Sequence, residues 1–300
     1  LDEPFAGLFT QGMVTHETYK DEAGDWLYPE EVGFGQGGAT HAKTGEAVTI
    51  GPIESMSKSK KNIVDPSAII ALYGADTARW FILSDTPPER DIQWTESGVD
   101  AAARFVQRLW KFIQEGLEAV CVPGKARPRA MSEAAVAIRK AAHKALHNVT
   151  EALETLRFNR AIAHVYEMTN DLGPLFADTQ SATAPDIRWA RREALEIYVR
   201  IFAPMMPHLA EQAWADLGHR TLVVKEPWPK VSKPLLVEDT VIIAIQVNGK
   251  RKGQIEVPRG LSREEIESRA LNEDNVGRAI SGREVRKVIV VPERIVNVVL

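Results

Sequence analysis

SMSKSKKN occupies residues 55–62 and places three lysines among three hydroxyl side chains. Gly51-Pro52 precedes this stretch and Asp65-Pro66 follows it, which predicts an exposed loop with a helix starting behind it. Ammonium groups, hydroxyls and backbone N–H groups suit a polyanion such as a triphosphate, because hydrogen bonds to charged oxygens contribute roughly 1.5–3 kcal/mol each. A solvated basic loop without a ligand would have the same composition, so composition alone leaves both interpretations open.

The order of the residues is more specific than their composition. The string MSKSKKN, followed by Asp65-Pro66 and by YGADTAR at residues 73–79, resembles the KMSKS signature of class I aminoacyl-tRNA synthetases. In that family the loop closes over ATP, and its second lysine holds the pyrophosphate while the amino-acid carboxylate attacks the α-phosphorus. The resemblance implies that Lys58 is the catalytic lysine. The ATP-binding residues that it implies are Ser55, Met56, Ser57, Lys58 and Ser59.

One position departs from the signature. The family's first lysine is replaced here by Ser55, which removes a cation from the edge of the loop. No HxGH string occurs in the sequence, so the resemblance includes the second signature of the family but not the first, HIGH.

Composition describes an ordinary water-soluble chain. Its 300 residues, 44% hydrophobic and 26% charged, are enough for two or three domains with buried cores. No run of 18 apolar residues and no signal-peptide pattern occurs, and the single cysteine, Cys121, cannot form an internal disulfide, so a cytoplasmic protein without a membrane span is expected.

Charge is distributed unevenly along the chain. Residues 1–96 carry 7 Lys and Arg against 16 Asp and Glu, whereas residues 97–300 carry 30 against 25. The basic surplus of the later part permits docking on a nucleic-acid backbone.

Apolar spacing predicts the architecture. Residues 7–14 are expected to form a buried strand, and Asp65 and Asp76 are expected to cap two helices behind the loop. Helical spacing then continues to about residue 218, with Ser97 and Ser132 as helix caps, and short connections predict an antiparallel bundle. Its further helices are predicted at 159–170, 186–202 and 207–217.

The last segment changes period. Alternating apolar residues lead to Asn248-Gly249, a hairpin signal, and Ser262 with Glu265 forms a capping box before a helix and two more strands. QVNGK at residues 246–250 and IEVP at residues 255–258 resemble the C-terminal domain of bacterial leucyl-tRNA synthetases, which reaches the outer corner of the tRNA. APMMPHLAE at residues 203–211 resembles the end of the anticodon-binding bundle of the leucine, isoleucine, valine and methionine enzymes.

Together these features predict a multidomain α+β protein that corresponds to the C-terminal third of a leucyl-tRNA synthetase. The expected domains are the end of a Rossmann-type catalytic domain with the KMSKS loop (1–96), an antiparallel α-helical anticodon-binding bundle (97–237) and a small α+β tRNA-binding module (238–300). The parent enzyme is expected to be a monomer that forms leucyl-adenylate from leucine and ATP with Mg²⁺, and then transfers the leucyl group to tRNA(Leu). This chain alone is not expected to complete the reaction, and no metal site is predicted within it.

Basic residues of the last segment are candidate tRNA contacts. They are Lys250, Arg251 and Lys252 after the hairpin turn, and Arg286 and Lys287 before the next strand, with Arg188, Arg191 and Arg192 as weaker candidates. Each of them is equally compatible with a solvated surface. Two other functions stay open: a sister ligase for isoleucine, valine or methionine, and a tRNA-binding subunit without catalytic activity.

Overall fold

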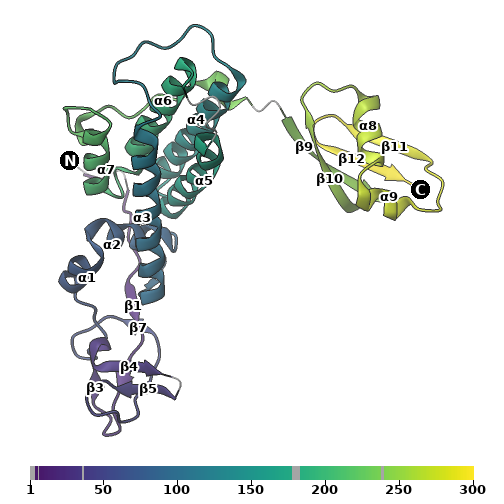
Figure 1. The fold of residues 1–300 in the computed structure, drawn as a ribbon. Helices are drawn as coiled ribbons and strands as arrows, with labels where there is room; N and C mark the ends of the chain where they lie inside the picture. Colours follow the sequence, from purple (N-terminus) through teal and green to yellow (C-terminus); the bar gives the residue numbers. More distant parts are fainter. Residues whose placement is uncertain (1–3, 6, 36, 178–182, 238–239) are drawn as a thin grey trace. The chain divides into compact units, whose positions relative to one another are not determined.

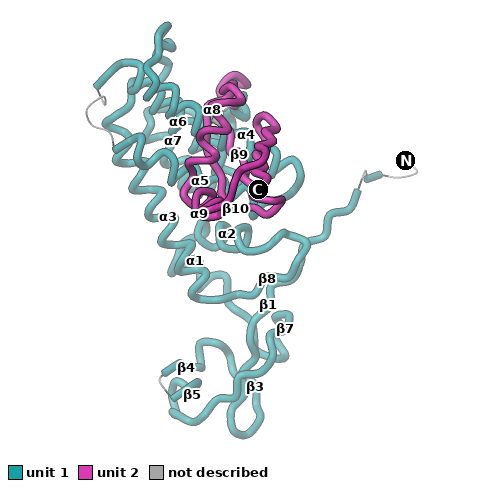
Figure 2. The backbone as a smooth tube through the Cα atoms, turned by 90° about the vertical axis from the view of Figure 1, so that its right-hand side faces the viewer, with its two compact units in different colours: residues 1–232 teal, residues 233–300 magenta. Residues whose placement is uncertain are grey.

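The computed structural model describes residues 4–5, 7–35, 37–177, 183–237 and 240–300. They form two compact units, residues 1–232 and residues 233–300, which Figure 2 colours separately. The second unit begins five residues earlier than the sequence predicted, because the short 3₁₀ helix η3 (Lys233–Leu236) groups with it. In the part of the chain that the structure describes, no helix is long and apolar enough to cross a membrane.

Short strands form the first part of unit 1. β1 (Val14–His16) is the central strand of a three-stranded sheet, antiparallel to β7 (Glu54–Ser55) and parallel to β8 (Ile92–Gln93). The remaining elements before the loop are β2 (Tyr19–Lys20), β3 (Trp26–Leu27), η1 (Pro29–Glu31), β4 (Val32–Gly35), β5 (Gly38–His41) and β6 (Thr49–Ile50). The predicted buried strand over residues 7–14 was wrong: β1 starts at Val14, and Leu8 is 91% exposed.

Helices make up the rest of unit 1. They are α1 (Pro66–Tyr73), α2 (Ala75–Ser84), α3 (Glu96–Leu117), α4 (Glu133–Glu154), α5 (Phe158–Ala177), α6 (Pro185–Phe202) and α7 (Pro207–Asp216), followed by η2 (Val223–Lys225). In Figure 1, α4 lies beside α5 and α6, and it packs against both. The helices expected from apolar spacing are present, although α5 continues past Pro174 to Ala177, seven residues beyond the predicted end.

Trp80 of α2 joins the loop-bearing part to the helices. Its side chain is completely buried, and its ring stacks on Phe105 of α3 with 5.1 Å between the ring centroids. Its indole N–H donates to the hydroxyl of Tyr166 on α5 at 3.0 Å. Residues on both sides of position 96 therefore share one hydrophobic core, so the predicted boundary at 96/97 does not separate two compact units, and the three-domain division stays a prediction.

Helix capping follows the sequence at two positions and departs from it at two others. Asp65 caps α1 and Ser132 caps α4, as expected. The cap of α3 is Thr95 rather than Ser97, since the Thr95 hydroxyl accepts from the backbone N–H of Gly98. Asp76 was expected to cap α2, but that helix begins at Ala75, so the expectation was wrong.

Asp76 instead caps α7, 132 residues away. Its carboxylate accepts from the backbone N–H of Leu209 at 2.6 Å and lies 2.9 Å from Nδ1 of His208. One helical turn later, Arg79 donates to the carbonyl oxygens of Pro204 (2.7 Å) and Met205 (3.0 Å), where the chain passes from α6 to α7. Helix α2 therefore satisfies the unpaired backbone groups on both sides of the α6–α7 corner.

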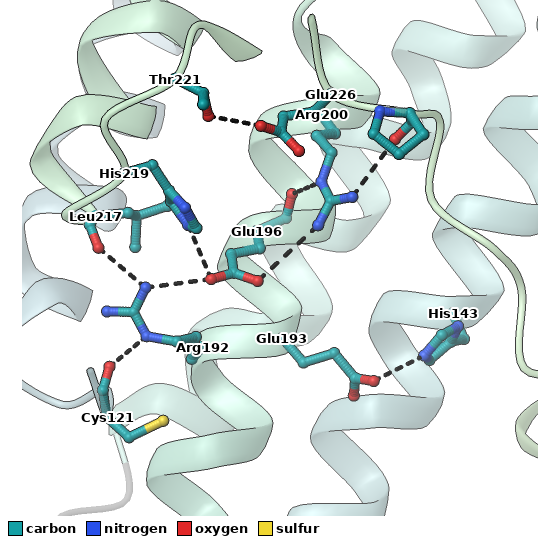
Figure 3. A network of polar contacts seen from close by, with 11 residues as sticks. Cys121, His143, Arg192, Glu193, Glu196, Arg200, Leu217, His219, Thr221 and Glu226 are labelled. Atoms are coloured by element: carbon teal, nitrogen blue, oxygen red, sulfur yellow. Dashed lines mark hydrogen bonds and ion pairs between the residues drawn. The ribbon is translucent and has the colours of Figure 1, made fainter. Parts of the chain in front are cut away.

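Glu196 of α6 connects the end of the helical region to its interior (Figure 3). Its carboxylate accepts from Arg192 at 3.2 Å and lies 2.9 Å from Nε2 of His219, and Arg200 approaches its second oxygen at 3.9 Å. The His219 ring in turn stacks on Trp214 of α7 at 3.7 Å. The charged groups of this network are paired, so the ion pairs and hydrogen bonds offset the free-energy cost of removing them from water. Through His219 the network also connects the segment after α7 to α6.

Unit 2 is one sheet with helices on one face. Its strand order is β10-β9-β12-β11, with β9 (Thr240–Val247), β10 (Lys250–Pro258), β11 (Lys287–Val291) and β12 (Ile295–Val299). Helices α8 (Arg263–Leu271) and α9 (Asp274–Ile280) cover the face that carries the buried side chains of these strands. The Asn248-Gly249 hairpin and the Ser262–Glu265 capping box are confirmed, whereas α9 was not predicted. At Gly253 a Cβ would lie 2.5 Å from the Glu273 carboxylate, so a larger residue there would displace that side chain.

Replacing Asp76 by alanine should weaken unit 1 more than an ordinary helix cap does. Asp76→Ala leaves the N-terminus of α7 uncapped in a buried place, so a loss of about 2 kcal/mol in the free energy of unfolding is expected. Urea unfolding followed by tryptophan fluorescence measures unit 1 alone, because all seven tryptophans precede residue 233. Asp65→Ala, which removes an exposed cap, is the matched control, with about 0.5–1 kcal/mol expected. Equal losses in the two variants would contradict this account.

Glu193 should make unit 1 sensitive to acid. Burial raises the pKa of Glu193, but hydrogen bonds from His143 and Arg139 outweigh it and leave the pKa below its ordinary value of 4.5. A carboxyl with a lowered pKa stabilises the fold above pH 4.5, and this contribution is lost as the pH falls through the folded-state pKa. Glu193→Gln should therefore flatten the fall of unfolding free energy below pH 4.5, and the exposed Glu154→Gln should not. If the unfolding free energy of Glu193→Gln falls below pH 4.5 as steeply as that of the unsubstituted chain, this role is ruled out.

Candidate functional site

The lysine-rich loop begins at the end of β7. Backbone pairing of Ser55 with Thr15 and of Glu54 with His16 fixes this strand against β1, and Met56 N–H donates to Val14 O at 3.3 Å. The Met56 side chain then faces an apolar cavity of about 430 Å³. Its walls include Val14, Val64, Ile69, Ile82, Leu83 and Trp94. Ser55 and Met56 thus anchor the start of the loop beside a cavity whose lining is apolar apart from Arg79.

The loop itself is a tight turn. The backbone N–H of Lys61 donates to the carbonyl of Lys58 at 3.3 Å, and Lys61 has a φ of 51°, in the left-handed region. The Ser57 hydroxyl accepts from the backbone N–H of Lys60 at 3.3 Å and lies 3.3 Å from the Ser59 hydroxyl. Hydroxyls that could contact a phosphate therefore also hold the turn in shape.

Asn62 lies at the base of the turn and is completely buried. Its Oδ1 accepts from the backbone N–H of Ser57 at 2.9 Å. Its Nδ2 lies 3.3 Å from the carbonyl oxygens of His16 and Glu54 and 3.4 Å from that of Ser55. Sequence reasoning assigned no role to Asn62, whose only signal was its place between a lysine run and apolar residues.

The three lysines differ in their surroundings. Lys60 forms an ion pair with Glu54, and the ammonium of Lys61 lies 5.2 Å from the centre of the Tyr28 ring. The side chain of Lys58 is exposed, and its ammonium makes no hydrogen bond or ion pair to any residue that the structure describes. Of the loop's ammonium groups, Lys58 is therefore the one that can bind an anion without first breaking an interaction within the chain.

No metal centre accompanies the loop. Across the described ranges, no group of three or more His, Cys, Asp or Glu side chains is arranged to hold a metal ion.

The candidate RNA contacts of unit 2 lie at one end of its sheet. Lys250, Arg251 and Lys252 start β10, and Arg286 and Lys287 lie at the start of β11, so the two groups are on opposite edges. The pairings of Lys250 with Val247, Val247 with Val298, and Val298 with Val288 place both groups at the same end. All five basic side chains are exposed, and three strand spacings separate the edges by about 14 Å. The sheet thus brings together residues that are more than 30 positions apart in sequence.

The weaker candidates on α6 have structural partners. Arg191 is 1% exposed, Arg188 donates to Val120 O at 2.6 Å, and Arg192 donates to the carbonyl oxygens of Cys121 and Leu217. These arginines hold the connections around α6 in place, so their guanidinium groups already have partners within the chain.

Two family models match this chain. Residues 136–268 match the model of the anticodon-binding domain of tRNA ligase, and residues 52–95 match that of class I tRNA synthetases (I, L, M and V). The leucine–tRNA ligases of Methylocella silvestris and Parvibaculum lavamentivorans are each 53% identical to this chain over 304 residues. Both matches cover the whole of this chain but only 35% and 34% of the relatives.

A solved structure gives the same result. The LeuRS of Agrobacterium radiobacter K84 agnB2, in a ternary LeuRS-tRNA-LeuAMS complex, matches with a TM-score of 0.69 and 27% identity, over 100% of this chain and 34% of that one. The chain thus spans about a third of the length of the proteins that it matches, and it belongs to the leucine–tRNA ligase family of class I aminoacyl-tRNA synthetases.

Proposed function

We propose that this chain supplies the KMSKS loop and the tRNA-binding parts of a leucine–tRNA ligase. The observation that carries the proposal is the state of the three loop lysines: two are held by neighbouring side chains, and Lys58 is exposed in a turn of fixed shape. The position of Lys58 in MSKSKKN is that of the family's pyrophosphate-binding lysine. The similarity to leucine–tRNA ligases extends over the whole chain, which favours leucine over the sister amino acids.

The proposed reaction has two steps. The leucine carboxylate attacks the α-phosphorus of ATP, which gives leucyl-adenylate and releases pyrophosphate; a hydroxyl of the tRNA's terminal ribose then takes the leucyl group and AMP leaves. Mg²⁺ bound with ATP would neutralise part of the phosphate charge. Negative charge grows on the departing pyrophosphate in the first step, and an ammonium positioned beside it lowers the barrier. We assign this role to Lys58, with the hydroxyls of Ser57 and Ser59 beside the phosphates.

The basic end of unit 2 is proposed to contact tRNA. Five exposed cations across an edge-to-edge distance of about 14 Å suit phosphates of a folded RNA, which proteins recognise largely by shape, phosphate and 2′-OH contacts. The residues are Lys250, Arg251, Lys252, Arg286 and Lys287. Because these cations would contact phosphates, they contribute affinity that depends on salt.

Lys58→Ala in the full-length enzyme should slow leucine-dependent pyrophosphate exchange. If the ammonium contributes about 3 kcal/mol in the transition state alone, the rate falls by roughly 10²-fold. Lys60→Ala changes the loop charge equally but removes a lysine already paired with Glu54, so it should cost a few-fold at most. An exchange rate that Lys58→Ala leaves unchanged would favour the alternative, a tRNA-binding subunit without a catalytic role.

Lys250→Ala and Arg286→Ala should each weaken binding of the 300-residue chain to leucine tRNA. The slope of log affinity against log salt should fall by about one for each phosphate contact that is lost. Arg294→Ala is the control, because Arg294 is exposed in the same unit at the opposite end of the sheet. Equal effects of all three substitutions would mean that general charge, and not the basic end, determines the affinity.

A further inference from the structure

Asn62 stands apart from the rest of the lysine-rich loop. It is 0% exposed in a segment whose other polar side chains reach solvent in whole or in part. A buried amide is stable only when its donors and acceptor are used, and both ends of the Asn62 amide have partners within 3.4 Å.

These partners belong to three separate segments. Oδ1 closes the loop onto itself by accepting from the backbone N–H of Ser57. The two N–H donors of Nδ2 are shared among the carbonyl of His16 in β1 and those of Glu54 and Ser55 in β7. One side chain therefore links the start of the loop, its end and the two strands beneath it.

The turn that carries Lys58 lies inside this closed ring. Residues 58–61 form the turn, bounded by Ser57 and Asn62, so the amide of Asn62 fixes the separation of its ends. Lys61 has a left-handed φ, which costs free energy for a residue other than glycine. This conformation persists because the hydrogen bonds of the turn and of Asn62 hold the backbone in place. The neighbouring lysines contact Glu54 and Tyr28, which leaves the exposed Lys58 ammonium without a partner among the described residues.

We propose that Asn62 is a positioning residue for the activation step, acting through Lys58. This inference rests on the proposed function of the loop. Asn62 holds the turn in its productive shape before ATP binds, so that the Lys58 ammonium is already placed where pyrophosphate charge develops. An amide is needed, because a carboxylate would bring negative charge against three carbonyl oxygens and a serine is too short to reach both strands and Ser57.

A double-mutant cycle in the full-length enzyme tests the proposal. Lys58→Ala, Asn62→Asp and the double variant are compared by leucine-dependent pyrophosphate exchange. Asn62→Asp should slow exchange by roughly 10–10²-fold, as a displacement of about 1 Å does, without changing tRNA affinity. In the double variant the rate should be close to that of Lys58→Ala alone, because Asn62 is proposed to act through the Lys58 ammonium.

The controls separate positioning from loss of stability. Thr169→Val removes another buried side-chain hydrogen bond, to Tyr198 in the helical region, and should lower the unfolding temperature without slowing exchange. If Asn62→Asp does not fold, Asn62→Ala goes through the same cycle. Independent, multiplying effects of the two positions would overturn the positioning role while leaving Lys58 catalytic. An exchange rate unaffected by Lys58→Ala would overturn the proposed function as well, so the two failures are distinguishable.

Discussion

Complete burial of the Trp80 ring is the constraint on which unit 1 depends. An indole of this size must have apolar contacts all round it and a partner for its N–H, and here the partners come from α3 and α5. This fixes α2 against the helices that follow, and α1 and the lysine-rich loop directly precede α2. A loop that places a cation needs a rigid attachment, and the aromatic contact of Trp80 with Phe105 contributes to it.

Within the lysine-rich loop, some residues hold the turn in shape and another keeps its charge exposed to solvent. Two lysines and one asparagine hold the turn, and one lysine stays in solvent. This division resolves an ambiguity that composition leaves open, since a solvated basic loop and an anion-binding loop have the same residues. The difference lies in which ammonium groups already have partners.

The sequence predicted features that depend on near neighbours. The caps at Asp65 and Ser132, the Asn248-Gly249 hairpin and most helix bounds follow from local chemistry, and the structure confirms them. Prediction from the sequence failed where a side chain bonds to a residue far away in the chain. The sequence predicts that Asp76 caps its own helix, yet its carboxylate accepts from the backbone N–H of Leu209, 133 residues later. The positioning amide was missed for the same reason, because its partners come from β1 and β7 as well as the loop.

The bonds that Asp76 and Arg79 make to the α6–α7 corner affect how this region can be divided or inherited. A helical segment excised at residue 97 would lose the carboxylate that caps α7 and the guanidinium that satisfies the carbonyls after α6. Its smallest self-sufficient version therefore includes α2, a helix that sequence comparison assigns to the class I synthetase match at residues 52–95. A cut that falls before α2 keeps all of these bonds, so the segment that the contacts define is larger than the helical region that begins at residue 97.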